Sequence, residues 1–168
     1  MNLQLFDFTE PSAIDAWAAI DDRVMGGISH SRLRHDPAGH AVFEGQVSLA
    51  QNGGFASVRC RAGAFRTEGL AAATTCLVDL RGDHKSFKIS LFTDNHANSV
   101  SYQAGFTPAG EGWQTVCLPL DAFRPSLRGR EVRDAAALDP AKICQVGLLI
   151  AAQQAGPFKL EIRRIGLA

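Results

Sequence analysis

The acidic pair Asp21-Asp22 is the strongest candidate for cation chemistry, because two carboxylates stand just before the glycines Gly26 and Gly27. Carboxylates and backbone carbonyls could together hold a hard cation such as Ca²⁺, which takes six or more oxygen ligands. One acidic pair rarely supplies that many. We therefore expect Asp21 and Asp22 to accept hydrogen bonds from turn amides or to pair with an arginine, and we predict no metal and no cofactor.

Histidine and cysteine give only weak signals for a metal site. His35 and His40 flank the turn at 36–39, where a metal pair across a hairpin is conceivable, but a solvated hairpin end is the simpler interpretation. The four cysteines, at positions 60, 76, 117 and 144, form no CxxC and lie in strand-like segments. We expect them to be buried, reduced thiols.

A cluster of four arginines gives the clearest signal for a binding surface. Arg124, Arg128, Arg130 and Arg133 fall within ten residues, in a long connection at 119–141. Guanidinium groups at this density could dock an acidic partner surface or a phosphate. The alternative, which stays open here, is a solvated loop whose arginines pair with Asp21, Asp22 or Asp134.

Catalytic motifs are absent from the sequence. It contains no GxGxxG, P-loop, HExxH, GxSxG or EF-hand pattern, and no Ser, Cys or Thr stands beside a base in a recognisable arrangement. We predict that the protein is not an enzyme, although the residues of a catalytic triad need not be close in sequence.

Short alternating segments must position these side chains. Residues 10–20 show helical spacing, with Pro11 or Ser12 at the start and Ile14, Trp17 and Ala18 on one face. Beyond them, turn residues separate strand-like runs at 28–35, 40–50, 53–61, 72–80, 86–93, 99–106, 113–118, 142–152 and 158–165. This pattern predicts one all-β domain over residues 1–168, an antiparallel β-sandwich or jelly roll with one short N-terminal helix.

Alternation within the middle strands predicts a polar sheet face. If Val58, Phe87, Ile89, Tyr102 and Ala104 point into the core, the intervening residues point outward. If these strands are neighbours, the outward residues make a polar, partly basic, hydrogen-bonding face. Its members are Arg59, Lys88, Ser90, Ser101 and Gln103. Sugar-binding faces also carry stacking aromatics, and only Phe92 and Phe55 are candidates here.

Composition narrows the choice of partner and compartment. Lys plus Arg is 17 and Asp plus Glu is 17, so the charge balance does not favour nucleic acid. The start has neither a basic n-region nor a long apolar run, and the apolar run at 146–152 is too short to cross a bilayer. We predict a cytoplasmic protein without membrane insertion.

The segments at 21–29 and 52–59 resemble the complex I intermediate-associated protein 30 family. They read Asp-Asp-Arg-Val-Met-Gly-Gly-Ile-Ser and Asn-Gly-Gly-Phe-Ala-Ser-Val-Arg. Further segments at 81–83, 102–106, 113–114, 118–123, 127–130 and 156–162 extend the resemblance over nearly the whole chain. The motif residues, which we expect to be structural, are Trp17, Asp21, Asp22, Met25, Gly26, Gly27, Ser29, Gly53, Gly54, Phe55, Ser57, Gly82, Asp83, Tyr102, Trp113 and Gly129.

The resemblance implies a galactose-binding-like β-sandwich and a role in assembly. Mitochondrial members help to build respiratory complex I, and this chain resembles a free-standing bacterial-type member. His84 stands where the family often has a second glycine, so a different turn is expected there. We therefore expect a non-catalytic module that binds a protein partner, such as complex I subunits or intermediates. The alternative is a module that binds a small ligand or carbohydrate on its polar face.

Overall fold

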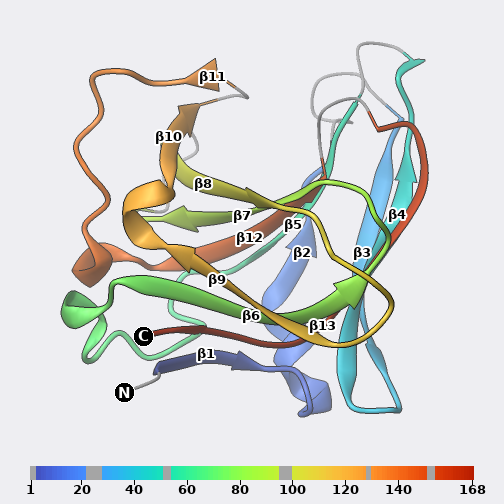
Figure 1. Cartoon of the computed structure of the whole chain (residues 1–168), viewed down its shortest axis with the longest axis horizontal. Helices are drawn as coiled ribbons and strands as arrows, with labels where there is room; N and C mark the ends of the chain where they lie inside the picture. Colours follow the sequence, from blue (N-terminus) through green and yellow to red (C-terminus); the bar gives the residue numbers. More distant parts are fainter. Residues whose placement is uncertain (1–2, 22–27, 51–53, 95–99, 128–129, 151–153) are drawn as a thin grey trace.

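The computed structural model describes residues 3–21, 28–50, 54–94, 100–127, 130–150 and 154–168, which form two antiparallel sheets packed face to face (Figure 1). The six-stranded sheet contains, in spatial order, β3 (His30–Asp36), β4 (His40–Val47), β13 (Gly156–Leu167), β6 (Thr75–Gly82) and β9 (Gln114–Pro119). Its sixth strand, β1 (Leu3–Asp7), pairs with the second half of β13. The fold is therefore a jelly-roll β-sandwich, as the alternation predicts.

The seven-stranded sheet carries the segments that the sequence marks as polar. Its spatial order is β11 (Arg130–Glu131), β10 (Arg124–Leu127), β8 (Ser101–Phe106), β7 (Phe87–Phe92), β12 (Gln145–Ile150), β5 (Ala56–Cys60) and β2 (Trp17–Ala19). Short 3₁₀ helices lie in the connections: η1 (Pro11–Ala16), η4 (Leu70–Ala72), η5 (Leu120–Ala122) and η6 (Pro140–Lys142). Among the described residues, no helix is both long enough and apolar enough to span a bilayer.

The core lies between the two sheets and is built by the predicted alternation. Val58, Phe87, Ile89, Tyr102 and Ala104 are all buried, which confirms their inward orientation. Aromatic rings join the layers at the centre. The ring of Phe43 on β4 lies 6.3 Å from that of Phe87 on β7, and 4.9 Å from that of Phe158 on β13. Burying each such ring stabilises the fold by roughly 1.5–3 kcal/mol.

The helix predicted over residues 10–20 is wrong in its second half. Helical structure is limited to the 3₁₀ helix η1, and Trp17–Ala19 form strand β2. Trp17 pairs with Cys60 on β5, and its ring packs 5.0 Å from that of Phe6. Pairing with β5 gives these three residues a ladder that an isolated short helix lacks, so tertiary context overrides the helical spacing.

The long connection at 119–141 also contains more order than the sequence suggests. Residues 124–127 pair with β8 as strand β10, and β11 pairs with β10. Cysteine burial is mixed. Cys60 and Cys76 are buried, but Cys117 is exposed on β9, so the prediction of four buried thiols is wrong there. All four cysteines are free, and burial raises the pKa of Cys76 to about 12.

Candidate binding face

One row of residues crosses the outer face of the seven-stranded sheet, the side turned away from the core. The strand register places Arg59 opposite Gly147, Gly147 opposite Ser90, Ser90 opposite Gln103, and Gln103 opposite Arg124. Cross-strand partners share a face of the sheet. We call this surface the polar face. It comprises Ser57, Arg59, Lys88, Ser90, Phe92, Ser101, Gln103, Gly105, Arg124, Ser126, Gln145, Gly147 and Leu149.

Arg59 is a half-buried cation held by an aromatic ring. Its guanidinium carbon lies 4.1 Å from the centroid of Phe92, a cation–π distance. Burial lowers the pKa of Arg59 below its ordinary value. In the part of the chain that the structure describes, Arg59 forms no ion pair or hydrogen bond through its side chain. The cation is therefore partly desolvated without a compensating anion.

Lys88 is the second cation of the polar face, and it is exposed. Its cross-strand partner on β8 is Gly105, where an added Cβ would lie 3.6 Å from its nearest heavy atom, the carbonyl oxygen of Phe87. Lys88, like Arg59, has no ion-pair partner among the described residues. The two cations that the sequence singled out on this face therefore both lack an ion-pair partner within the described ranges.

The hydroxyl groups of this face are less accessible than the alternation predicts. Ser90 and Ser101 lie on the polar face by register, but both are buried. The side-chain amide of Gln103 donates to Ser90 Oγ at 3.2 Å and to Ser101 Oγ at 3.3 Å. Gln103 thus covers both hydroxyls, and the prediction that they stand open on the surface is wrong.

Gln145 is a polar-face residue that the sequence reasoning missed. Its side-chain nitrogen donates to the carbonyl oxygen of Cys60 at 3.0 Å. Its side-chain oxygen is buried, and none of the described residues donates a hydrogen bond to it. A buried acceptor without a donor is unusual in a folded protein. The signal in the sequence was a lone polar residue at the start of an apolar strand.

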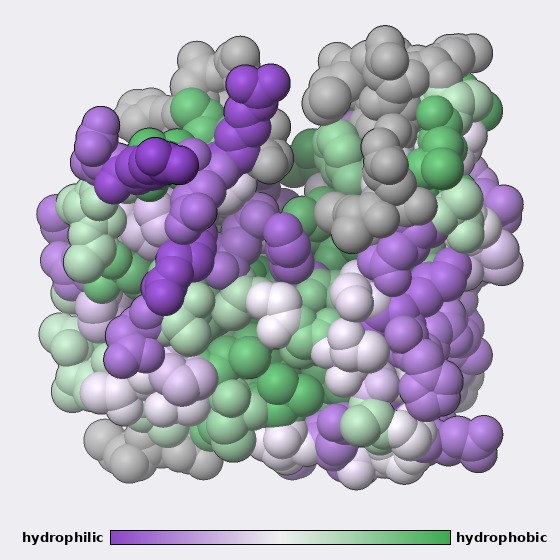
Figure 2. All heavy atoms as spheres, turned by 45° about the horizontal axis from the view of Figure 1, so that its top comes forward, coloured by the Kyte–Doolittle hydropathy of each residue, from purple (hydrophilic) through white to green (hydrophobic). Residues whose placement is uncertain are grey.

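The arginine cluster does not stay together. Arg124 is exposed on β10 and joins the polar row, where it donates to the carbonyl oxygens of Asp121 and Phe123. Arg130 pairs with Leu127, and Arg124 and Leu127 lie on opposite faces of β10. Arg128 lies outside the described residues. Hydrophilic side chains gather over β10 and β11, at the upper left of Figure 2.

Arg124 also borders a cavity at the open edge of the sandwich. The cavity has a volume of about 1010 Å³ and lies between η5 and the segment at 132–138. Tyr102 lines it, and its hydroxyl donates to the carbonyl oxygen of Ala136 at 2.7 Å. This bond ties the segment at 132–138 to β8.

Asp21 joins three parts of the chain. Its carboxylate accepts hydrogen bonds from the Ser31 backbone at 3.0 Å, the Ser31 hydroxyl at 2.5 Å and the Ser57 backbone at 3.0 Å. The Ser57 hydroxyl donates to the carbonyl oxygen of Ile20. Asp21 therefore accepts hydrogen bonds from two backbone amides, as expected, and from one hydroxyl. Asp22, Met25, Gly26, Gly27, Gly53 and Gly129 lie outside the described residues.

The remaining motif residues make contacts near the sheet ends. Ser29 is buried and its hydroxyl donates to the carbonyl oxygen of Ser48, whereas Gly54 and Phe55 are half-buried. Trp17 packs on Phe6. At the turn that contains His84, a Cβ on Gly82 would lie 2.7 Å from the carbonyl oxygen of Lys159, so only glycine fits. Asp83 then accepts from the Lys159 backbone at 2.7 Å.

Trp113 lies on the opposite side of the molecule, on the outer face of the six-stranded sheet. The guanidinium carbons of Arg163 and Arg81 lie 4.1 Å and 4.7 Å from its ring, and the His40 ring centroid lies 5.3 Å away. A β-bulge between Ile162 and Arg164 directs Arg163 to this position. Trp113 is thus an anchor for charged side chains.

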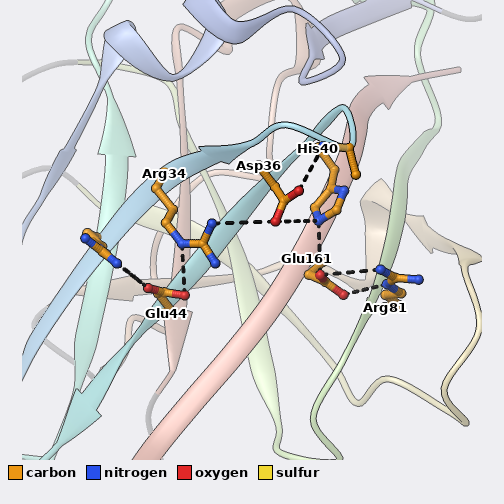
Figure 3. Close-up of polar contacts among 8 residues, drawn as sticks. Arg34, Asp36, His40, Glu44, Arg81 and Glu161 are labelled. Carbon is orange, nitrogen blue, oxygen red and sulfur yellow. Dashed lines mark hydrogen bonds and ion pairs between the residues drawn. The ribbon is translucent and has the colours of Figure 1, made fainter.

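The charged side chains of this second face pair with one another (Figure 3). Glu161 accepts from Arg81 at 2.5 Å and contacts His40 Nε2 at 3.0 Å. Burial alone would raise the pKa of Glu161, but Arg81 and His40 together hold it below its ordinary 4.5. We call this set the charge network. Its members are Arg32, Arg34, Asp36, His40, Glu44, Arg81 and Glu161.

Neither histidine of the hairpin has the surroundings of a metal ligand. His40 Nε2 contacts Glu161, whereas His35 Nε2 contacts the carbonyl oxygen of Phe8 at 3.1 Å. The register pairs His35 with Ala41 and His40 with Asp36, so the two imidazoles lie on opposite faces of the hairpin. Within the described ranges, no three His, Cys, Asp or Glu side chains are grouped as a metal site would need.

Comparison with known proteins places both the fold and the family. A family 11 carbohydrate-binding module from Clostridium thermocellum, solved with a β-1,3-1,4-mixed-linked tetrasaccharide, has a TM-score of 0.69 and 16% identity. The match covers 99% of this chain and 94% of that module. The fold is accordingly a galactose-binding-like jelly roll.

Sequence relatives cover most of this chain. An uncharacterized protein of Schizosaccharomyces pombe is 31% identical over 88% of the chain and 75% of its own length. The mitochondrial complex I intermediate-associated protein 30 of Mus musculus is 26% identical over 97% of the chain, which spans 55% of that protein. The model of the same family matches residues 6–162. The chain belongs to the complex I intermediate-associated protein 30 family.

Proposed function

We propose that this protein is a non-catalytic binding module that holds a protein partner on the polar face during assembly of respiratory complex I or another membrane complex. The observation that carries the proposal is the pair of unpaired cations, Arg59 and Lys88, on a face with hydrogen-bonding side chains. Charged groups without intramolecular partners favour charge-assisted contacts to another molecule. Family membership supports the assembly role.

The partner is expected to be acidic where it meets this face. Arg59, Lys88 and Arg124 give the polar face three cations, and none of them forms an ion pair with a described residue. Electrostatic complementarity would then speed association and select the orientation of the partner. We also propose a cytoplasmic location, whereas the mouse relative is mitochondrial by name.

A capture experiment tests this function. The tagged chain serves as bait in detergent extracts of a host that has complex I, and bound proteins are identified by mass spectrometry. The double variant R59E/K88E should lose complex I subunits or intermediates, or the subunits of another membrane complex. The matched control is K159E, because Lys159 is an exposed lysine on the outer face of the other sheet.

Two results would contradict the proposal. Failure of the wild-type chain to capture any subunit of a membrane complex would overturn the assembly role. Equal capture by the wild type and by R59E/K88E would show that the partner does not bind through Arg59 and Lys88 of the polar face. Thermal melting of each variant would verify that the fold is intact.

The second candidate is a module that binds a small ligand or carbohydrate on the same face. The fold likeness to carbohydrate-binding modules and the hydrogen-bonding row favour it. The weak point is aromatic stacking, since Phe92 is buried and the Arg59 guanidinium lies over its ring. A glycan array and a thermal-shift screen test this candidate. A specific glycan that raises the melting temperature would establish carbohydrate binding and would count against the protein-binding proposal.

A further inference from the structure

Two of the three unpaired cations of the polar face lie opposite a glycine. Arg59 on β5 pairs with Gly147 on β12, and Lys88 on β7 pairs with Gly105 on β8. Glycine weakens the interior of a strand, and within sheets it often marks a place where another backbone approaches closely. Gly147 is buried, but Gly105 is exposed, so a ligand can lie against the sheet beside Lys88.

Backbone geometry does not require these glycines. Neither Gly105 nor Gly147 has a positive φ. A Cβ on Gly147 would lie 3.2 Å from the carbonyl oxygen of Val58 and 3.4 Å from Phe92 Cε2, so the Phe92 ring uses part of that space. At Gly105 the nearest atoms are 3.6 Å and 4.0 Å away, which are ordinary contacts. Packing therefore explains Gly147 in part and leaves Gly105 unexplained.

The spacing of the two cations limits the ligand. Arg59 and Ser90 both pair with Gly147, so Arg59 and Lys88 are two strands and two residues apart. At about 4.8 Å between strands and 3.4 Å per residue, their Cα atoms are separated by roughly 12 Å. The Arg59 guanidinium lies over Phe92, which pairs with Gln145, whereas Lys88 pairs with Leu149 on the other side of Gly147. This arrangement favours two carboxylates over one shared anion. An extended peptide advances by the same distance in about four residues.

We propose that Arg59 and Lys88 bind two carboxylates of one extended acidic segment of the partner, whose backbone lies over the exposed Gly105. This inference rests on the proposed function and specifies its ligand. Arginine and lysine form charge-assisted hydrogen bonds with carboxylates, which are stronger than hydrogen bonds between neutral groups.

A titration followed by amide chemical shifts tests the inference on the full chain. The probe is Ac-Gly-Glu-Gly-Ser-Gly-Glu-Gly-NH₂, with glutamates four residues apart, and the control peptide has glutamine at both positions. The glutamate peptide should shift the amide signals of Gly105 and Gly147, and the glutamine peptide should not. R59Q and K88Q should each weaken binding at least fivefold, whereas K159Q should leave it unchanged.

A steric variant separates shape from charge. In G105V, a side chain fills the space beside Lys88 and both cations remain. This variant should bind the glutamate peptide at least fivefold more weakly than the wild type does. A thermal melt verifies that the variant is folded. Unchanged peptide binding by G105V would overturn the backbone placement. A last titration uses inorganic phosphate at the same concentration as the peptide. If phosphate shifts the same two amide signals equally, the site binds anions in general and the peptide proposal is overturned.

The peptide result and the capture result can fail separately. If R59E/K88E loses the captured membrane-complex subunits but the glutamate peptide does not bind, the acidic segment is overturned and the proposed function stands. If both peptides shift Gly105 and Gly147 equally, the carboxylates are again excluded. If capture is insensitive to R59E/K88E, the proposed function itself fails at this face.

Discussion

The outer faces of the two sheets use charge in opposite ways. On the six-stranded sheet, the cross-strand partner of Glu161 is Arg81, and each carboxylate of the charge network contacts a basic side chain. On the seven-stranded sheet, the cross-strand partners are uncharged: Ala18 and Gly147 for Arg59, and Leu149 and Gly105 for Lys88. Paired charges stabilise the fold itself, whereas unpaired charges remain available to another molecule. This difference is the reason for placing the proposed partner on the polar face.

The largest effect is expected on the face with paired charges. Glu161→Ala should lower the free energy of unfolding by about 2 kcal/mol, because it leaves the buried His40 and the Arg81 guanidinium without their carboxylate. Urea denaturation of the variant and the wild type measures the difference. A loss no larger than that of K159A, a surface control on the same strand, would break the comparison.

Acid should destabilise the charge network in particular. Burial would raise the pKa of Glu161 and of Glu44, but their basic neighbours hold both below the ordinary 4.5. A carboxyl group with a lowered pKa in the folded chain stabilises the fold above its unfolded pKa, and this stabilisation is lost as the pH falls through its folded pKa.

The double variant E44Q/E161Q therefore sharpens the comparison. Between about pH 5 and 3, its stability should fall less steeply than that of the wild type, since glutamine does not titrate. The variant R59Q/K88Q should keep the wild-type slope. In the wild type, Arg59 and Lys88 stay charged throughout this pH range, so they contribute nothing to the slope that the variant could lose. Thermal melts at a series of pH values measure both. A wild-type slope in E44Q/E161Q would contradict the role of the network.

A smaller loss is expected at the edge of the network. The Arg32 side chain is 67% exposed and forms an ion pair with Glu44 at 2.7 Å. An exposed pair of this kind contributes about 0.5 kcal/mol, and added salt weakens it. Arg32→Ala should therefore cost about that amount in urea denaturation at low ionic strength. A loss as large as that of Glu161→Ala would show that exposure does not govern these pairs.

The smallest effect on stability is expected at Arg59, despite its burial. Its guanidinium is partly desolvated and has no anion among the described residues, so Arg59→Met should change the free energy of unfolding by less than about 0.5 kcal/mol. Methionine would continue to cover the Phe92 ring. Chemical denaturation checks this, and a loss of several kcal/mol would assign Arg59 a structural role and break the comparison.

Alternation in the sequence was enough to predict which side of each middle strand faces the core. Val58, Ile89 and Ala104 followed from local spacing alone, because side chains along a strand point to alternate faces. The family resemblance added the galactose-binding-like topology. The cations Arg59 and Lys88 were found because they occupy the remaining positions of the same strands.

Long-range pairing could not be predicted in the same way. Nothing local indicates that β12 lies between β5 and β7, which is what places Gly147 beside Arg59. Likewise, Arg124 joins the polar face only because β10 pairs with β8. A lone glycine inside the apolar run at 146–152 was the available signal, since such glycines often mark close backbone approach.

The position of β13 has a consequence for how the protein folds. This strand pairs with β1, β4 and β6, all of which precede it in the chain. During synthesis, those three strands emerge from the ribosome before the strand that joins them exists. Contacts between residues that are distant in sequence slow folding. Strand edges that lack their partner strand are prone to aggregate until that strand pairs with them. The six-stranded sheet can therefore be completed only after β13, the last strand of the chain, has been synthesised.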